Sequence, residues 1–80
     1  MTFGECLVAA VKLLPNDSVC VGVEAWSYPN GDTRLVWDVW SDRYHEHFYG
    51  SSPESVLAAV QSYLDDKARD AKARIEAVSI

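Results

Sequence analysis

The sequence predicts an α+β fold in the order α-β-β-β-α, with a three-stranded antiparallel meander sheet and two helices packed on one face. Apolar residues recur at steps of three and four near both ends of the chain, which is typical of amphipathic helices. In the middle, apolar and polar residues alternate, as in strands with one buried face. Proline, glycine, asparagine and serine separate these segments and mark the turns.

The first helix is expected over residues 3–14. Thr2-Phe3-Gly4-Glu5 fits a capping box, in which the threonine hydroxyl and the glutamate carboxylate satisfy free backbone N–H groups at a helix start. Pro15, followed by Asn16-Asp17, ends the helix. The apolar stripe of this helix consists of Phe3, Leu7, Ala10, Val11 and Leu14.

The first two strands are expected to form a hairpin over residues 19–28 and 33–41. Pro29-Asn30-Gly31 suits a three-residue loop in which Gly31 takes a positive φ angle. This loop sets Tyr28 opposite Asp32, and apolar residues then meet along one face. The predicted pairs are Ala25 with Leu35, Val23 with Trp37, and Val21 with Val39.

The third strand is expected over residues 45–49, after a turn at residues 41–44. Phe48 is placed on the core face, because an aromatic side chain there adds to the apolar row of the second strand. The predicted pairs are Phe48 with Trp37, His47 with Asp38, and His45 with Trp40.

The second helix is expected to start after Ser52, which can cap it, with Pro53 at its first position and Glu54 near the positive end of the helix dipole. Its apolar stripe consists of Val56, Leu57, Val60, Leu64, Ala68, Ala71 and Ile75. After Leu64 the stripe thins to alanine, so we expect residues 65–80 to project from the body or fray. The whole chain, 1–80, is predicted to be a single domain.

The net charge of −5 lies entirely on residues 1–64, where eight acids face three bases. A field of this sign repels nucleic acid and anionic membranes and attracts basic protein surfaces. We therefore expect a protein partner with a basic surface, no direct nucleic acid and no membrane. Cys6 and Cys20 form no disulfide framework, and the chain starts without a signal peptide, so a cytoplasmic location is expected.

The sequence carries no motif of nucleophilic, phosphate-binding or zinc-dependent catalysis, so we predict that the protein is not an enzyme and uses no cofactor. His45, His47 and Asp38 could meet on one side of the sheet as metal ligands. A third strong ligand and an enclosing pocket are not evident in the sequence. Alternating polar residues of a half-exposed strand explain the same pattern, and no metal site is predicted.

Trp26 and Trp40 are predicted to lie on the sheet face that no helix covers, where large aromatic residues often anchor interfaces. Alternatively, Trp26 forms a cation–π pair with Arg34 and has a structural role. A set of carboxylates on the strands and hairpins could imitate the phosphates of DNA, or could serve only as solubility charge. These acids are Glu24, Asp32, Asp38, Asp42 and Glu46.

The chain resembles the small acidic α/β proteins of bacteriophages and mobile elements, which include the anti-CRISPR inhibitors. The resemblance covers most of the chain and rests on unspecific motifs. These are Leu13-Leu14-Pro15, Gly22-Val23-Glu24-Ala25-Trp26, Trp37-Asp38-Val39-Trp40 and His47-Phe48-Tyr49-Gly50, followed by Ser52-Pro53-Glu54.

This resemblance implies an inhibitor that binds a CRISPR-Cas effector in the host bacterial cytoplasm. The implied target is a type I surveillance complex (Cascade), whose PAM-reading or strand-binding surface relies on lysine and arginine. A monomer is expected rather than a dimer. The alternative is an accessory protein of a virion or host complex that binds through the aromatic sheet face.

Overall fold

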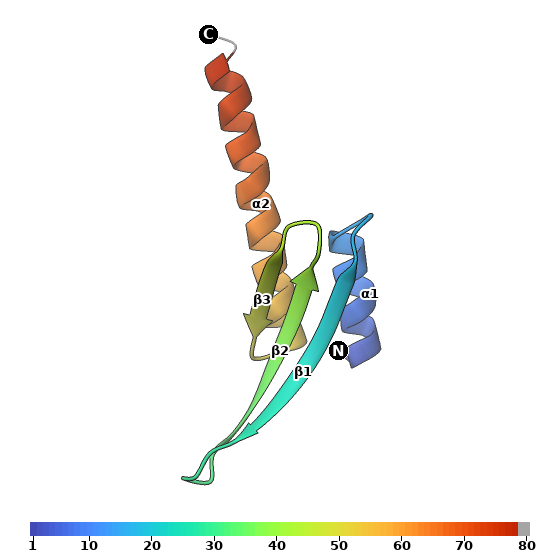
Figure 1. Ribbon diagram of the computed structural model, residues 1–80, viewed down its shortest axis with the longest axis vertical. Helices are drawn as coiled ribbons and strands as arrows, with labels where there is room; N and C mark the ends of the chain where they lie inside the picture. Colours follow the sequence, from blue (N-terminus) through green and yellow to red (C-terminus); the bar gives the residue numbers. More distant parts are fainter. Residues whose placement is uncertain (79–80) are drawn as a thin grey trace.

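The computed structural model describes the backbone of residues 1–78 and side chains through Glu76. It confirms the predicted fold class: a three-stranded antiparallel sheet of order β1-β2-β3 follows one helix and precedes another. The sheet lies beside both helices, while the β1–β2 hairpin and the end of α2 project at opposite ends of the molecule (Figure 1). The elements are α1 (Phe3–Leu13), β1 (Val19–Ser27), β2 (Thr33–Ser41), β3 (Glu46–Gly50) and α2 (Pro53–Val78).

Helix α1 starts with the predicted capping box. The backbone N–H of Thr2 donates to the Glu5 carboxylate at 3.0 Å, and the backbone N–H of Glu5 donates to the Thr2 hydroxyl at 3.2 Å. These hydrogen bonds, led by the one from the Thr2 backbone, lower the pKa of Glu5. The N-terminal boundary of α1 is thus set by a local motif that the sequence displays.

The apolar stripe predicted for α1 is only partly correct. Ala10 and Leu14 are buried together with Cys6, which the stripe omitted. In contrast, Phe3, Leu7 and Val11 keep 46%, 36% and 49% of their surface exposed. The buried row is rotated from the predicted one because the small Cys6 and Ala10 side chains permit a close approach to the sheet and α2.

The first hairpin has the predicted register. Ala25 pairs with Leu35, Val23 with Trp37, and Val21 with Val39. The backbone N–H of Tyr28 donates to the carbonyl of Asp32 at 2.8 Å, and Gly31 has a φ angle of 90°. The left-handed φ angle is accessible to glycine without steric cost, so the loop chemistry fixes the pairing of both strands.

The predicted register between β2 and β3 is wrong by two residues. Phe48 pairs with Val39, not Trp37, and His47 pairs with Trp40, not Asp38. His45 lies in the turn with a φ angle of 52°, so the third strand starts one residue later than predicted. Because a shift of two residues preserves the alternation of side chains, every strand residue keeps its predicted face.

The core lies between the sheet and both helices. Val21, Val39 and Phe48 contribute from the sheet, and Val56 and Val60 from α2. Trp37, expected to be buried, is half-buried against this core, and its ring centroid lies 6.2 Å from that of Phe3. The core is therefore concentrated at one end of the sheet.

Helix α2 begins as predicted. The backbone N–H of Ser55 donates to the Ser52 hydroxyl at 3.1 Å, and Pro53 is the first helical residue. From Asp65 to Glu76 every residue is exposed, and this part of the helix extends beyond the sheet (Figure 1). The projecting end expected from the thinning apolar stripe is present and helical through Val78.

Candidate functional site

Within residues 1–78, one face of the sheet is free of helices, because both helices pack against Val21, Val39 and Phe48 on the other face. We call it the open face. Its residues follow from strand alternation. They are Cys20, Gly22, Glu24 and Trp26 from β1, Arg34, Val36, Asp38 and Trp40 from β2, and His47 and Tyr49 from β3.

A row of rings crosses the open face. The centroid of the Trp40 ring lies 4.9 Å from that of His47, and the His47 ring stacks on Tyr49 at 5.4 Å. The His45 ring, from the preceding turn, approaches Trp40 at 6.1 Å. Trp40 is half-buried by these neighbours, whereas Tyr49 is 61% exposed. The row offers a flat, partly desolvated aromatic surface.

Asp38 lies at the centre of the open face and is held from two sides. Its carboxylate lies over Gly22, its partner on β1, where a Cβ atom would collide with it. Its Oδ2 atom lies 3.7 Å from Nε2 of His47, so the two form an ion pair when the histidine is protonated. The carboxylate thus lies between Gly22 and His47, and the Asp38 side chain is 24% exposed, so an incoming cation can reach it.

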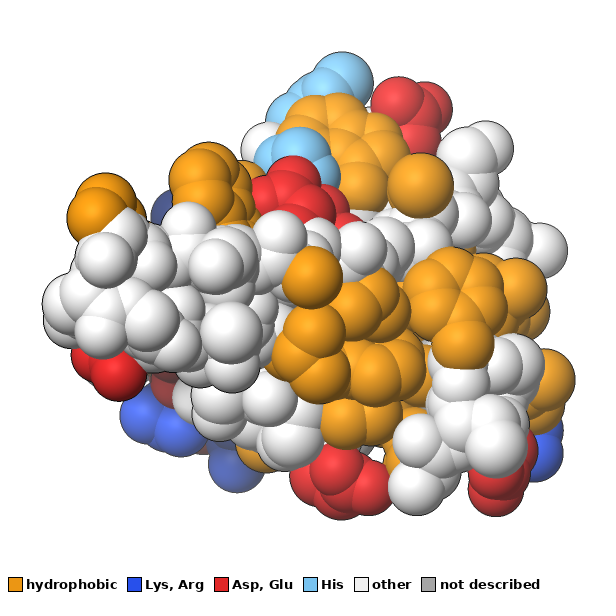
Figure 2. Space-filling model, turned by 90° about the horizontal axis from the view of Figure 1, so that it is seen from below, with side chains coloured by type: hydrophobic (Ala, Val, Ile, Leu, Met, Phe, Trp, Pro, Cys, Tyr) orange, Lys and Arg blue, Asp and Glu red, His pale blue; other side chains and the backbone are white. Residues whose placement is uncertain are grey.

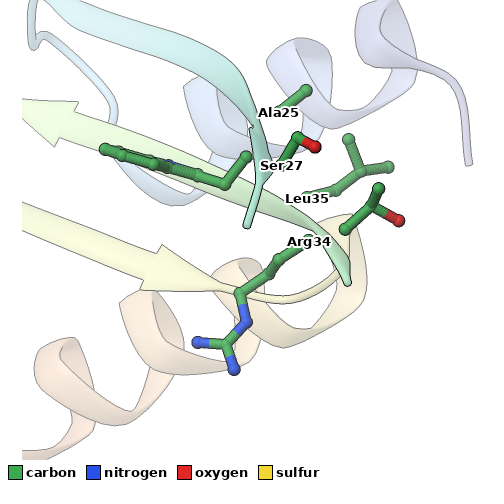
Figure 3. Close-up of a pocket in the computed structure, with 6 residues that line it drawn as sticks. Ala25, Ser27, Arg34 and Leu35 are labelled. Carbon is green, nitrogen blue, oxygen red and sulfur yellow. The ribbon is translucent and has the colours of Figure 1, made fainter. Parts of the chain in front are cut away.

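Trp26 is the most exposed tryptophan of the open face, at 52%. It pairs with Arg34 in the sheet, and its indole N–H donates to the Glu24 carboxylate at 3.3 Å. Trp26 and Arg34 help to line an open depression of about 390 Å³ near the end of the hairpin. Figure 3 shows the Arg34 side chain pointing away from Ala25 and Leu35, which lie on the other side of the hairpin.

The five predicted carboxylates do not gather in one patch. Glu24 and Asp38 share the open face. Asp32 lies at the hairpin tip, and Asp42 lies past the far end of β2, about 30 Å away for a strand of this length. Glu46 starts β3 on the face of Ser41 and Phe48 and is half-buried. Only Glu24 and Asp38 combine with the aromatic residues.

Asp17 has a structural role that the sequence did not reveal. Its carboxylate accepts hydrogen bonds from the Ser41 hydroxyl at 2.5 Å and from the Arg43 backbone N–H at 2.8 Å. The Ser41 hydroxyl, in turn, accepts from the backbone N–H of Tyr44 at 3.2 Å. The Ser41 bond, as the main cause, lowers the pKa of Asp17. An aspartate in the loop after a helix and a serine at a distant strand end are too common to have indicated this clamp.

Within residues 1–78, no three histidine, cysteine, aspartate or glutamate side chains are placed to hold a metal ion. In particular, the turn conformation of His45 removes it from the strand position that the metal hypothesis assumed. In the same part of the chain, no helix is long and apolar enough to span a membrane. Comparison with known proteins gives no match, whether to a protein-family model, to a curated protein or to a solved structure.

Proposed function

We propose that the protein is an inhibitor of the anti-CRISPR kind, which acts in the bacterial cytoplasm and binds a CRISPR-Cas effector through the open face. The effector we propose is a type I Cascade complex, and binding would block its recognition of target DNA and PAM. The observation that carries the proposal is the arrangement of Glu24 and Asp38 between Trp26 and Trp40 on a face that no helix covers.

Carboxylates of this kind suit a protein surface that binds DNA phosphates. Lysine and arginine side chains of such a surface donate charge-assisted hydrogen bonds to oxyanions, and a carboxylate provides two acceptor oxygens. His47 lies 3.7 Å from the Asp38 carboxylate, a long distance for an ion pair, so an arginine or lysine of the partner can take the place of the histidine. The aromatic side chains on either side add apolar contact area and exclude water from these bonds.

The distribution of charge also favours a partner with a basic surface. The acids after Leu64 are balanced by an equal number of bases, so the surplus of five negative charges lies on the compact body. A target that binds nucleic acid presents the opposite charge, which raises the association rate through long-range attraction.

The test uses a purified Cascade complex and a PAM-containing DNA duplex, with DNA binding measured at increasing concentrations of the protein. We expect the wild type to prevent DNA binding. The variant Glu24→Gln/Asp38→Asn should bind the effector at least about tenfold more weakly, because two charge-assisted contacts are lost.

The matched control is Asp65→Asn/Asp70→Asn, which removes the same charge from exposed positions on α2. This control should inhibit like the wild type, and circular dichroism should show that both variants are folded. If a saturating amount of wild type leaves DNA binding by Cascade unchanged, the proposal is wrong for this effector.

The row formed by Trp40, His47 and Tyr49 favours a second candidate, an accessory protein of a virion or host complex that docks through aromatic contacts. Tyr49→Ala removes the exposed end of the row without changing the charge. A loss of partner binding in this variant, with no loss in Glu24→Gln/Asp38→Asn, would favour the second candidate.

A further inference from the structure

We propose that two copies of this chain associate through antiparallel pairing of their β1 strands, which joins the two sheets into one of six strands. This inference does not depend on the proposed target, because it concerns the edge of the sheet and the underside of the hairpin. It departs from the expectation of a monomer. Four features of the structure lead to it.

The first feature is an unprotected sheet edge. In the order β1-β2-β3, no strand of the described residues pairs with the outer side of β1 over its nine residues, Val19–Ser27. The Tyr28–Asp32 hydrogen bond marks the even-numbered residues of β1 as those bonded to β2. The backbone groups of Val21, Val23 and Ala25 therefore point to the free edge. This edge contains no proline, no lysine and a single charge, Glu24, so it lacks the usual features that prevent strands from pairing.

The second feature is an overhang of the hairpin. Helix α1 covers the first half of β1, where Val21 is 9% exposed. On the same face, Val23 is 39% exposed, Leu35 is 53% exposed, and Ala25 is also exposed. These are the residues that meet in apolar cross-strand pairs, yet no element of the chain covers them within the described residues. Figure 2 shows the hydrophobic side chains gathered in a broad patch in the middle of the face seen from below.

The third feature is an apolar row on α1 beside the free edge. Ala9 and Leu13, one residue before the buried Ala10 and Leu14, are half-buried, whereas Leu7 and Val11 are exposed. Helix α1 packs against β1 and α2 and lies on the side of the sheet away from β3 (Figure 1). The half-buried side of α1 therefore faces α2, and the exposed row lies toward the free edge of β1.

The fourth feature is that one symmetry operation makes these surfaces complementary. Full overlap of two antiparallel β1 strands places Val23 at the two-fold axis, since it is the central residue of the strand. Each overhang then lies beside the first half of the partner's β1, which α1 of the partner covers. The row of Leu7 and Val11 from one copy would thus pack on Ala25 and Leu35 of the other, as an isologous interface requires.

The exposed surface is large enough for this contact. Five apolar side chains of these surfaces keep between 36% and 53% of their area exposed: Phe3, Leu7, Val11, Val23 and Leu35. The backbone of the paired strands adds to this area, which brings the contact toward the roughly 800 Å² per partner that is standard for specific interfaces. Glu24 meets Gly22 of the partner in this register, so the two Glu24 carboxylates are not directly opposed.

Analytical ultracentrifugation of the full chain tests the proposal. We expect a dimer for the wild type, and an increase of at least about tenfold in the dissociation constant for Ala25→Pro, which removes an N–H from the free edge but no bond to β2. Val11→Lys should weaken the dimer similarly. Val8→Lys is the matched control, because Val8 is on α1 and 55% exposed but is turned farther from the sheet. Circular dichroism should show that every variant is folded.

Cross-linking tests the register independently. In a Cys20→Ser background, the V23C chain should form a disulfide with its own copy under mild oxidation, since its Cα atoms would lie about 5.5 Å apart at the axis. The S27C chain should not form this disulfide, because the Cα atoms of position 27 in the two copies would lie roughly 27 Å apart. A wild type that sediments as a monomer up to about 1 mM would overturn the proposal. So would equal dissociation constants for Ala25→Pro, Val11→Lys and Val8→Lys.

Discussion

At the scale of single residues, Asp17 connects three segments that are distant in the sequence. It follows α1, yet its carboxylate holds the end of β2 through Ser41 and the next turn through Arg43. One carboxylate thus ties the loop after α1 to the end of β2 and to the turn in which His45 adopts a left-handed conformation. This turn leads into β3, where His47 pairs with Trp40.

Asp17→Asn should lower the thermal stability in a pH-dependent way. The pKa of Asp17 is lowered in the folded state, so its ionised form stabilises the fold above the unfolded pKa of about 3.9, and this contribution is lost as the pH falls through the lower folded pKa. We expect the variant to melt a few degrees below the wild type at pH 6 and the two curves to converge near pH 2. Thermal melts across this range measure it.

Asp70→Asn serves as the control for this titration, because Asp70 lies on the exposed part of α2. It should follow the wild type at every pH. A difference between Asp17→Asn and the wild type that stays constant from pH 6 to pH 2 would contradict the assigned role of the carboxylate.

At the scale of elements, local chemistry decided what could be predicted from the sequence. The capping box at Thr2, the hairpin loop at Gly31 and the cap at Ser52 each carry their own hydrogen-bonding pattern, and all three elements start or turn where predicted. The predicted β2–β3 register was wrong because the turn between these strands carries no such local pattern: His45 has a left-handed φ angle in this turn, and β3 starts one residue later than predicted. The predicted buried face of α1 was partly wrong, since the sequence could not show which of two adjacent apolar rows meets the sheet.

For the candidate site, too, the sequence predicted what local pattern decides and missed what contacts between distant residues decide. Strand alternation placed Trp26, Trp40, Glu24 and Asp38 on the open face, because alternation survives a shift of two residues. The sequence also placed His47 beside Asp38, and the two side chains lie 3.7 Å apart although His47 pairs with Trp40 and not with Asp38. It could not show that the Asp38 carboxylate lies against Gly22, where a Cβ atom would collide with it, since this depends on the side-chain conformation. The sequence likewise could not show that Asp32, Asp42 and Glu46 lie apart from this site, because their positions depend on where the strands end.

The end of α2 should be dispensable for the fold. From Asp65 to Glu76 its residues are exposed, and exposed positions away from the core and the helix caps contribute little to stability. Removing residues 69–80 should change the melting temperature by less than about 5 °C while lowering the helical signal. Val60→Ala, which opens a cavity in the buried core, should destabilise the protein more. A truncated chain that is unfolded at 25 °C would show that the projecting helix supports the body.

At the scale of the whole molecule, shape and charge are unevenly distributed. The principal extents are 59 × 26 × 20 Å, because the hairpin and α2 project at opposite ends. The surplus negative charge lies on the body, and most of the exposed aliphatic side chains lie on the underside of the hairpin and on α1. The two proposed contacts thus use different faces and different forces: charge attraction on the open face and apolar burial at the edge.

Salt should therefore act on the two contacts in opposite directions. Between about 0.1 M and 1 M NaCl the Debye length falls from about 10 Å to about 3 Å. Binding to a basic effector should weaken, because its attraction is screened, whereas self-association of two chains that each carry −5 should strengthen, because their repulsion is screened. Titrations of both equilibria at the two salt concentrations measure the effect. A dimer that weakens with salt would indicate that ion pairs, and not apolar contacts, hold it.

Of the two free cysteines, Cys20 offers an accessible thiol on the open face that can be labelled chemically. Cys6 is fully buried, and burial raises the pKa of its thiol, which keeps it protonated and unreactive. Cys20 is exposed on the open face, where it pairs with Trp40. A maleimide dye would therefore attach to Cys20 alone, without any engineered mutation. The emission of the dye should change when a partner covers Trp40, so a single labelled sample could follow binding to the open face in real time.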